Sequence, residues 1–178
     1  LFAPAIADQY FIKFLFHKNV DNFDDYLISA GLFAKSWELN DEKYFPALFD
    51  KHYFSMFFEQ HGVRVPKTLA YNDRSVFFQD GNISLLHNPE DLLKYLLQLK
   101  EKNNKSEHLI IKMRRESFGG KDVYKVNVNK LKTDKSFLHD IYNTITKDAY
   151  IIQDFIIQNK EINMLNPHSV NTMRMTTY

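Results

Sequence analysis

The pattern of hydrophobic and polar residues changes near Pro66. Before this proline, apolar residues recur three and four positions apart, as in YFIKFLF and VDNFDDYLISAGLF, which is the spacing of one helix face. The segment FPALFDKHYFSMFFEQHG continues this spacing, with Pro46 suited to a first helical turn and Gly62 suited to the end of the helix. We therefore expect helices in this part, the last of them with a buried aromatic stripe. The stripe consists of Phe49, Phe54, Phe57 and Phe58.

Short strands and two further helices are predicted after Pro66. Alternating or apolar runs are separated by turn-forming residues such as Asp80 and Gly81. Asn88 and Asp134 are suitable N-caps, and Pro89 is suited to a first helical position. We expect helices at about residues 89–100 and 134–146, and strands at residues 67–71, 75–79, 81–86, 108–113, 122–128, 149–157 and 169–178.

The order of these elements predicts an α+β fold. From residue 83 onward the order is β-α-β-β-α-β, followed by one more strand. This order matches a ferredoxin-like sandwich, which has its helices on one face of an antiparallel sheet. We expect three parts along the chain: a helical region, a β-α-β-β-α-β lobe and the beginning of a second lobe. They cover residues 1–72, 73–157 and 158–178.

Composition narrows the classes of function. The 23 Lys and Arg residues nearly balance the 22 Asp and Glu residues, so we expect no general attraction to nucleic acid or to an anionic membrane. The chain has no cysteine, which excludes disulfide scaffolds and thiolate zinc sites and favours a reducing cytoplasm. No apolar run approaches the roughly 20 residues of a membrane-spanning helix. The seven histidines lack metal-ligand spacing and are expected to be structural or at the surface.

Two adjacent glycines, Gly119 and Gly120, lie between the strands of the central hairpin. In one interpretation they supply only the positive φ that a tight turn needs. In the other interpretation they bring backbone N–H groups close to a phosphate, whose charge nearby lysines neutralise. The patterns of a Walker loop and of a kinase glycine-rich loop are absent. The hairpin alone leaves both interpretations open.

The order of motifs around this hairpin resembles the ATP-grasp superfamily. Asp50 and Lys51 precede GVRVP, and a strand ending in Lys112 precedes the loop ESFGGKDV. IIQDFI, Glu161 and LNPHSVNTMRMTTY follow. The last segment is the most specific, because its NP-x-S-x-NT-x-R-x-x-T pattern resembles ATP-grasp proteins associated with sugar transfer and polysaccharide gene clusters. The resemblance begins at about residue 44 and implies a nucleotide held between two α+β lobes.

The resemblance implies roles in ATP binding for several residues. Lys112 is implied to contact the α and β phosphates as a mobile point charge, and Lys51 to lie near the nucleotide. The loop 117–121 is implied to cover the β and γ phosphates, main-chain groups of residues 153–156 to bind adenine, and Glu161 to bind the ribose. The implied ATP-binding residues are Lys51, Lys112, Ser117, Phe118, Gly119, Gly120, Lys121, Gln153, Asp154, Phe155, Ile156 and Glu161.

Each of these residues has an ordinary alternative role. Lys112 fits a solvated strand end, Lys51 fits a helix surface, and a lysine at position 121 is common after a turn. Phe155 and its neighbour Ile156 fit a hydrophobic core, and Glu161 fits the protein surface. The residues themselves do not decide between these roles and the ones that the resemblance implies.

Arg174 is the candidate catalytic residue. Met173 and Met175 share the opposite face of the predicted last strand, so the Arg174 side chain is expected to point away from the core. The resemblance implies that it faces the cleft and stabilises the charge on a transferred phosphoryl or acyl-phosphate group. An arginine on a solvated edge strand is the alternative. Ser169 and Asn171 are candidates for orienting this strand or for contacting the substrate.

The chemistry implied by the resemblance is that of a ligase that uses ATP and Mg²⁺. Such an enzyme activates a carboxylate as an acyl phosphate, which an amine or another nucleophile attacks, and the resemblance suggests substrates linked to a cell-surface polysaccharide. No acidic residue follows Arg174, so the oxygen ligands of Mg²⁺ are expected beyond residue 178 and the chain is interpreted as a fragment. A non-catalytic module that binds nucleotide or acts through partner proteins is the alternative. A small-molecule kinase is disfavoured because its catalytic Asp motif is absent.

Overall fold

The computed structural model describes residues 41–103, 106–115, 117, 120–167 and 170–171 of the 178-residue chain. The chain divides into two compact units, Leu1–Phe45 and Pro46–Tyr178. The described part of the first unit is short and contains the 3₁₀ helix η2 (Glu42–Tyr44), which begins after the N-cap Asp41. All strands of the described residues belong to the second unit.

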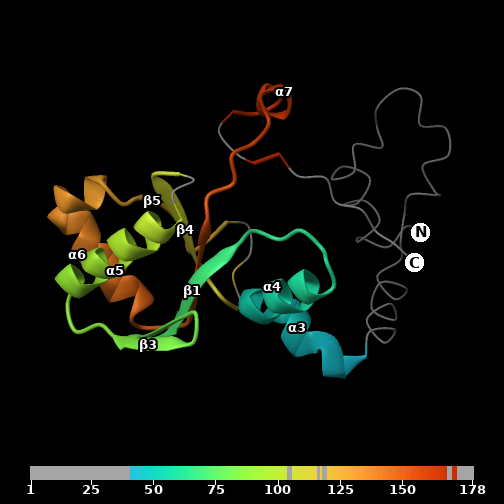
Figure 1. Cartoon of the computed structure of the whole chain (residues 1–178), viewed down its shortest axis with the longest axis horizontal. Coiled ribbons are helices and arrows are strands. Elements are labelled where there is room, and N and C mark those ends of the chain that lie inside the picture. The colour runs from blue at the N-terminus through green and yellow to red at the C-terminus, as the bar shows by residue number, and fades with distance from the viewer. Residues whose placement is uncertain (1–40, 104–105, 116, 118–119, 168–169, 172–178) are drawn as a thin grey trace, which may run out of the picture. The chain divides into compact units, whose positions relative to one another are not determined.

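The second unit is built on a six-stranded sheet (Figure 1). Its strand order is β3-β2-β1-β6-β4-β5, and every neighbouring pair is antiparallel. The mixed arrangement of helices and antiparallel sheet confirms the α+β prediction. The strands are β1 (Thr68–Asp73), β2 (Val76–Gln79), β3 (Asn82–Leu85), β4 (His108–Met113), β5 (Val123–Asn127) and β6 (Tyr150–Asp154).

Two tight turns hold β1, β2 and β3 in a meander. Asp80 and Gly81 both have positive φ, at 48° and 78°, as a two-residue hairpin turn requires. Asn72 fixes the other end of the meander, because its buried side chain bonds three separate segments. Its Nδ2 donates to the carbonyl oxygens of Arg74 at 2.7 Å and Ile145 at 2.8 Å, and its Oδ1 accepts from the backbone N of Tyr150 at 2.9 Å.

Two helices, α5 (Pro89–Lys102) and α6 (Lys135–Ile145), cover one face of the sheet (Figure 1). Both predicted N-caps are confirmed: Asn88 Oδ1 accepts from a backbone N–H in α5 at 2.9 Å, and Asp134 Oδ1 accepts one in α6 at 3.0 Å. The hydrophobic core lies between these helices and the sheet. Its fully buried members include Phe77, Leu92, Leu96, Leu99, Ile111, Leu138, Ile141, Ile145 and Ile152.

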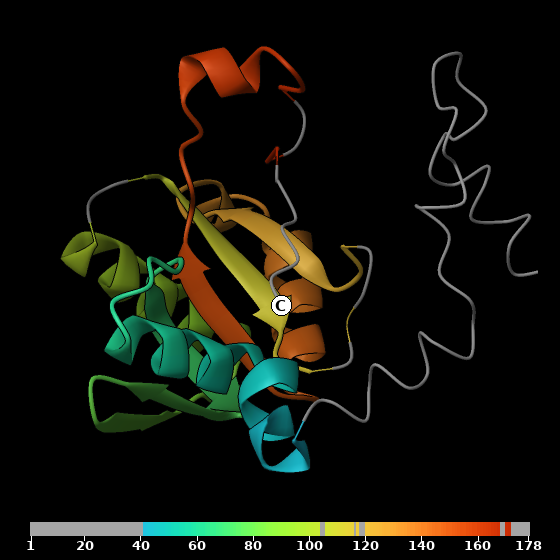
Figure 2. The same ribbon diagram turned by 90° about the vertical axis from the view of Figure 1, so that its right-hand side faces the viewer.

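The other face of the sheet carries the helix α4 (Lys51–Gln60), which lies in front of the sheet in Figure 2. The N-cap Asp50 separates it from α3 (Phe45–Phe49), so the predicted single helix is two. The predicted buried stripe is wrong: Phe49, Phe54 and Phe57 are 48%, 38% and 38% exposed. The buried residues of α4 are His52 and Ser55. At 100° per residue these two point away from the phenylalanines, so a polar side of the helix faces the sheet.

The strand order also corrects the ferredoxin-like prediction. The sequence of elements from β3 to β6 is β-α-β-β-α-β, as predicted. However, the connection through α5 joins β3 to β4 across three intervening strands of the sheet. The connection through α6 joins β5 to β6 across β4 alone. The reason is that the tight turns keep β3 at the edge, while β1 pairs with β6 at the centre. The boundary predicted between residues 72 and 73 falls within β1.

The chain leaves the sheet earlier than predicted. β6 ends at Asp154, and residues 155–159 have no regular structure. A short helix that the sequence pattern did not indicate, α7 (Lys160–Asn163), follows. The last predicted strand lies outside the described residues, except for Val170 and Asn171.

Candidate functional site

The register of the sheet places two lysines on the face opposite α5 and α6. Ile110 in β4 pairs with Lys125 in β5 and with Gln153 in β6. Paired residues of an antiparallel ladder share a face, as do residues two apart in one strand. Lys112 therefore lies on the same face as Lys125 and Gln153. α4 packs on this face through Ser55, whose Oγ lies 3.3 Å from Gln153 Nε2.

An ion pair fixes the beginning of α4 against the end of β4. Arg114 donates from Nε to Asp50 Oδ1 at 3.1 Å and from Nη2 to Asp50 Oδ2 at 2.7 Å, and the two side chains are only 11% and 5% exposed. Asp50 Oδ1 also accepts from the backbone N of His52 at 2.9 Å, which caps the helix. The backbone N of Lys51 donates to the Arg114 carbonyl at 2.9 Å. A buried bidentate pair allows little freedom, so Lys51 is held beside β4.

Stacked rings extend this network. His52 stacks on Tyr71 with ring centroids 3.8 Å apart, and Tyr71 stacks on Phe78 at 4.9 Å. The Arg114 guanidinium lies 5.4 Å from the centroid of the Tyr71 ring. Burial and the positive charge of Arg114 lower the pKa of His52, against the opposite effect of Asp50. His52 is thus a packed, neutral ring.

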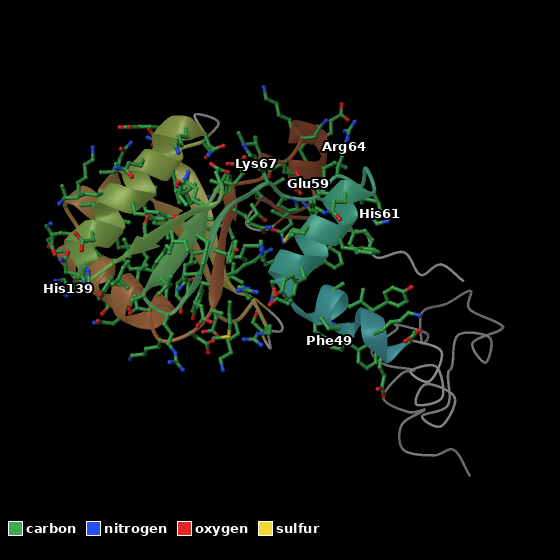
Figure 3. The ribbon with its side chains drawn as sticks, turned by 60° about the horizontal axis from the view of Figure 1, so that its bottom comes forward. Phe49, Glu59, His61, Arg64, Lys67 and His139 are labelled. Atoms are coloured by element: carbon green, nitrogen blue, oxygen red, sulfur yellow. The ribbon has the colours of Figure 1, made fainter. Side chains whose placement is uncertain are left out.

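The described part of the chain contains no group of three or more His, Asp or Glu side chains placed to hold a metal ion. Figure 3 shows His61, at the end of α4, and His139, on α6, on opposite sides of the sheet. His61 and His139 therefore cannot bind the same metal ion. The Mg²⁺ ligands expected beyond residue 178 stay a prediction.

Lys51 and Lys112 form a partly buried pair of ammonium groups. Lys51 Nζ donates to Ser117 Oγ at 3.0 Å and to the Arg114 carbonyl at 3.4 Å. Burial lowers the pKa of Lys112, and the charge of Lys51 lowers it further. Burial also lowers the pKa of Lys51, against the opposite effect of Asp50. No carboxylate of the described residues forms an ion pair with either lysine, so a bound anion would offset an uncompensated charge.

A cavity of about 320 Å³ lies where the chain leaves β6. Lys125 Nζ lies 4.3 Å from the centroid of the Phe155 ring, and the His108 ring contacts the same phenylalanine at 5.5 Å. The volume is in the range of small-molecule sites, and the mixture of apolar walls and a few polar groups is typical of them. The lining residues are Lys125, Phe155, Ile156, Ile157, Gln158, Asn163, Pro167 and Val170.

The predicted adenine-binding residues fall into two groups. Gln153 and Asp154 belong to the ladder of β6, and the Gln153 side chain is 2% exposed. Its Nε2 lies close to Ser55 Oγ, the Pro66 carbonyl and Thr68 Oγ1, at 3.3, 3.2 and 3.3 Å. Phe155 and Ile156 lie beyond the strand and line the cavity. The structure therefore brings the second group, but not the first, to the space that could hold a ligand.

Asn171 and Glu161 lie in the segment that continues from this cavity. The backbone N of Asn171 donates to Gln158 Oε1 at 2.6 Å, and its Nδ2 donates to the carbonyl oxygens of Ile162 at 2.9 Å and Asn166 at 3.2 Å. Asn171 thus ties this segment together. The Glu161 side chain is exposed, and its backbone N donates to Asn159 Oδ1 at the beginning of α7. Neither residue is among those that line the cavity.

The remaining predicted residues belong mainly to the hairpin. Gly120 has a φ of 80°, which confirms that this position needs the freedom of glycine, and both Gly120 and Lys121 are exposed. Ser117 is placed by its bond to Lys51. Phe118, Gly119, Ser169 and Arg174 lie outside the described residues.

Two residues of this face were not singled out from the sequence. Arg114 carries the buried ion pair, and Lys125 lines the cavity. Alternation in DVYKVNV puts Lys125 on the side opposite Val126, but only the strand register shows what it faces. Arg114 directly follows an apolar strand. A charged residue at the end of a strand gives no indication in the sequence that its side chain is buried.

One of the comparisons with known proteins found a match. A family model described as sugar-transfer associated ATP-grasp matches residues 35–178, which include the lysine pair and the cavity. Comparison with curated proteins and with solved structures found no match. In the part of the chain that the structure describes, no helix has both the length and the apolar character needed to span a bilayer.

Proposed function

Because this chain belongs to the sugar-transfer-associated ATP-grasp family, we propose that it forms the ATP-binding part of a ligase. The observation that carries this proposal is the pair formed by Lys51 and Lys112, two partly buried ammonium groups that form no ion pair with a carboxylate of the described residues. Lysines that lose hydration without an ion-pair partner are typical of a site that receives an anion. ATP supplies that anion.

The triphosphate binds at the lysine pair. Lys112 contacts the phosphates from β4, and Lys51 contacts them from the first turn of α4. Ser117 bonds Lys51 and so brings the hairpin loop to the same place. The glycines of this loop let its backbone approach the phosphates.

Adenine binds in the cavity at Phe155 and Ile156. Both cavity and lysine pair belong to the same face of the sheet, since Lys125 lines the cavity and shares a face with Lys112. Main-chain groups beyond Asp154 are the expected partners of adenine, because those of Gln153 and Asp154 belong to the sheet. The segment from residue 158 begins the second lobe, which closes the nucleotide site from the other side, and Glu161 binds the ribose.

The reaction proceeds through an acyl phosphate. A substrate carboxylate oxygen attacks the γ phosphorus of ATP, and the bond to the β-phosphate oxygen breaks to release ADP. An amine or another nucleophile then attacks the acyl carbon, phosphate leaves, and the nucleophile loses its proton. Lys51 and Lys112 hold the phosphates in line and offset negative charge, which is the main contribution of a protein to phosphoryl transfer. Arg174 stabilises the transferred group. The family description names an association with sugar transfer, and we propose that the substrates belong to polysaccharide assembly.

Calorimetric titration of the full chain with Mg-ATP tests nucleotide binding. We expect wild-type protein to bind, and Lys112→Ala to weaken binding by about 10- to 100-fold, because a charge-assisted contact contributes about 1.5–3 kcal/mol. Lys94→Ala removes an exposed lysine from α5, on the opposite face, and should bind like wild type. Absence of binding by wild type, or equal affinity of the two variants, would contradict the proposed site.

Trapping with hydroxylamine tests the chemistry. Hydroxylamine attacks an acyl phosphate to give a hydroxamate and free phosphate. When the protein is incubated with Mg-ATP and a carboxylate substrate, we expect hydroxamate and ADP in equal amounts. ADP formation that does not depend on any carboxylate would contradict the ligase mechanism while leaving nucleotide binding intact.

A further inference from the structure

A second cavity, of about 290 Å³, lies at the outer edge of the sheet. Its walls come from β4, β5, the 3₁₀ helix η3 (Lys130–Lys132) and the beginning of α6. Lys125 lines this cavity as well as the cavity at Phe155. The lining residues are His108, Lys125, Asn127, Lys130, Asp134 and Phe137.

Two exposed lysines, Lys125 and Lys130, make the charge of this cavity mainly positive. Lys125 and Lys130 form no ion pair with a carboxylate of the described residues. Asp134 Oδ1 already accepts from the backbone N of Phe137 at 3.0 Å, because it caps α6. The cavity therefore carries two ammonium groups against one carboxylate that already has a structural role.

The position of Lys130 is fixed by the fold. Asn127 Oδ1 accepts from the backbone N of Asn129 and of Lys130, both at 3.1 Å. The next residue, Leu131, is 1% exposed and packs in the core. A backbone that is already ordered reduces the entropy lost when the ammonium group takes a ligand.

His108 supplies a third nitrogen group. Its pKa is lowered by burial and by the charge of Lys125, and also by Lys130, while the neighbouring Glu107 raises it. Glu107 Oε2 lies 3.5 Å from Asn127 Nδ2, and Asp134 faces the cavity from α6. Near neutral pH the imidazole is uncharged, and an anion beside it would favour its protonation.

We propose that this cavity binds a phosphate group, either free or carried by a small organic molecule, at a site that shares Lys125 with the proposed adenine cavity and lies apart from the lysine pair proposed for the triphosphate. Lys125, Lys130 and His108 approach the cavity from three elements, which suits the three acceptor oxygens of a phosphate. Phe137 adds an apolar wall, and the volume exceeds what a phosphate ion alone needs.

The test is an NMR titration of the His108 ring, made in the Lys112→Ala variant so that phosphate binds more weakly at the nucleotide site. Inorganic phosphate and phenyl phosphate are the two probes. We expect both to raise the pKa of His108. Tighter binding of phenyl phosphate would identify an organic phosphate as the ligand, whereas equal binding would identify free phosphate.

Two variants on η3 make the test specific. Lys130→Ala should weaken phosphate binding by about tenfold, as expected when one charge-assisted contact is lost. Lys132→Ala, which removes an exposed lysine two residues away that does not line the cavity, should leave binding unchanged. A His108 pKa that does not respond to either probe, or equal effects of the two variants, would overturn the proposal. With Lys112 present, Lys130→Ala should still bind Mg-ATP like wild type, so failure here is distinguishable from failure of the nucleotide site.

Discussion

The two ends of the face that carries α4 are built differently. At the ion-pair end, defined by Asp50 and Arg114, polar atoms are buried and bonded to one another. At the cavity end, defined by Lys125 and Phe155, the chain leaves the sheet and an open space remains. The first arrangement positions groups, and the second is the place that we propose for a ligand. The ion pair holds Lys51 beside the end of β4, the strand that carries Lys112, on the same face of the sheet as the cavity proposed for the nucleotide.

This contrast explains how a polar helix face can pack on a sheet. α4 contacts the sheet through His52 and Ser55 rather than through its phenylalanines. The contacts of this region are directional. The His52 ring stacks on Tyr71, the Ser55 hydroxyl lies beside the Gln153 amide, and the Asp50 carboxylate caps the helix. Directional contacts determine the angle of the helix more narrowly than apolar packing does, which matters because its first residue, Lys51, is the one proposed to bind phosphate.

Removal of one partner from the buried ion pair should have the largest effect. Arg114→Ala leaves the Asp50 carboxylate buried without its partner, and we expect a loss of about 3–5 kcal/mol in the free energy of unfolding. Urea denaturation measures this loss. The double variant Asp50→Ala/Arg114→Met should lose less than the sum of the two single variants, because no buried charge is left unpaired.

Arg115→Ala is the matched control. Its side chain is 62% exposed and lies 3.9 Å from Asp50 Oδ2, so its removal should change stability by no more than about 0.5 kcal/mol. If both arginine variants unfold at the same urea concentration, the ion pair does not anchor α4, and the contrast between the two ends of the face is lost.

The next largest effect is expected at Lys112. Lys112→Met keeps the approximate length of the side chain but removes the ammonium group. The pKa of that group is lowered mainly by burial. ATP binding should weaken by about 10- to 100-fold, in line with loss of about 1.5–3 kcal/mol. The melting temperature should rise, by about 2–4 °C for each 1 kcal/mol gained, because the variant no longer buries an uncompensated charge. A variant that binds weakly and melts lower would indicate a structural role instead.

The pH dependence of ATP binding should also reveal the charges of Lys51 and Lys112, with a smaller effect than that of Lys112→Met. Both lysines have a pKa below the usual 10.5. Only the protonated forms attract phosphate, so ATP affinity should fall as the pH rises through these lowered values. The measurement runs from about pH 8 upward, where the terminal phosphate is already fully ionised. The change is smaller than in Lys112→Met because only a fraction of the molecules loses the charge. Affinity that stays constant up to the usual lysine pKa of 10.5 would contradict the assignment.

Much of the fold could be predicted from local patterns, as two elements illustrate. Asn88 and Asp134 are N-caps because a short polar side chain before an apolar repeat has few other uses. The strand order could not be derived in this way. β1 lies beside β6 because of pairing between residues about 80 apart, for example Ala70 with Ile152, and no local signal encodes such a partner.

The candidate site likewise contains residues that the sequence indicates and residues that only the structure reveals. Lys112 and the glycine loop were found because their order along the chain resembles a known family, and the family match is confirmed. The role of Arg114 depends on a partner 64 positions away, and the role of Lys125 depends on the strand register. The error at Phe54 and Phe57 has a related cause: spacing shows that a helix has an apolar side but not that this side faces the sheet.

The smallest effect is expected at the cavity end, where Lys125 lies over the Phe155 ring. A cation–π contact at a partly exposed site contributes about 0.5–1 kcal/mol, so Phe155→Leu should weaken ATP binding by only about two- to fivefold. Lys125→Met keeps the aliphatic stem and isolates the charge. If the pair acts as one wall of the adenine site, the double variant should bind about as well as the weaker single variant. Effects that multiply instead would mean that Lys125 and Phe155 contact the nucleotide independently. The cavity would then be a space that the ligand fills, without a wall that is preformed to receive it.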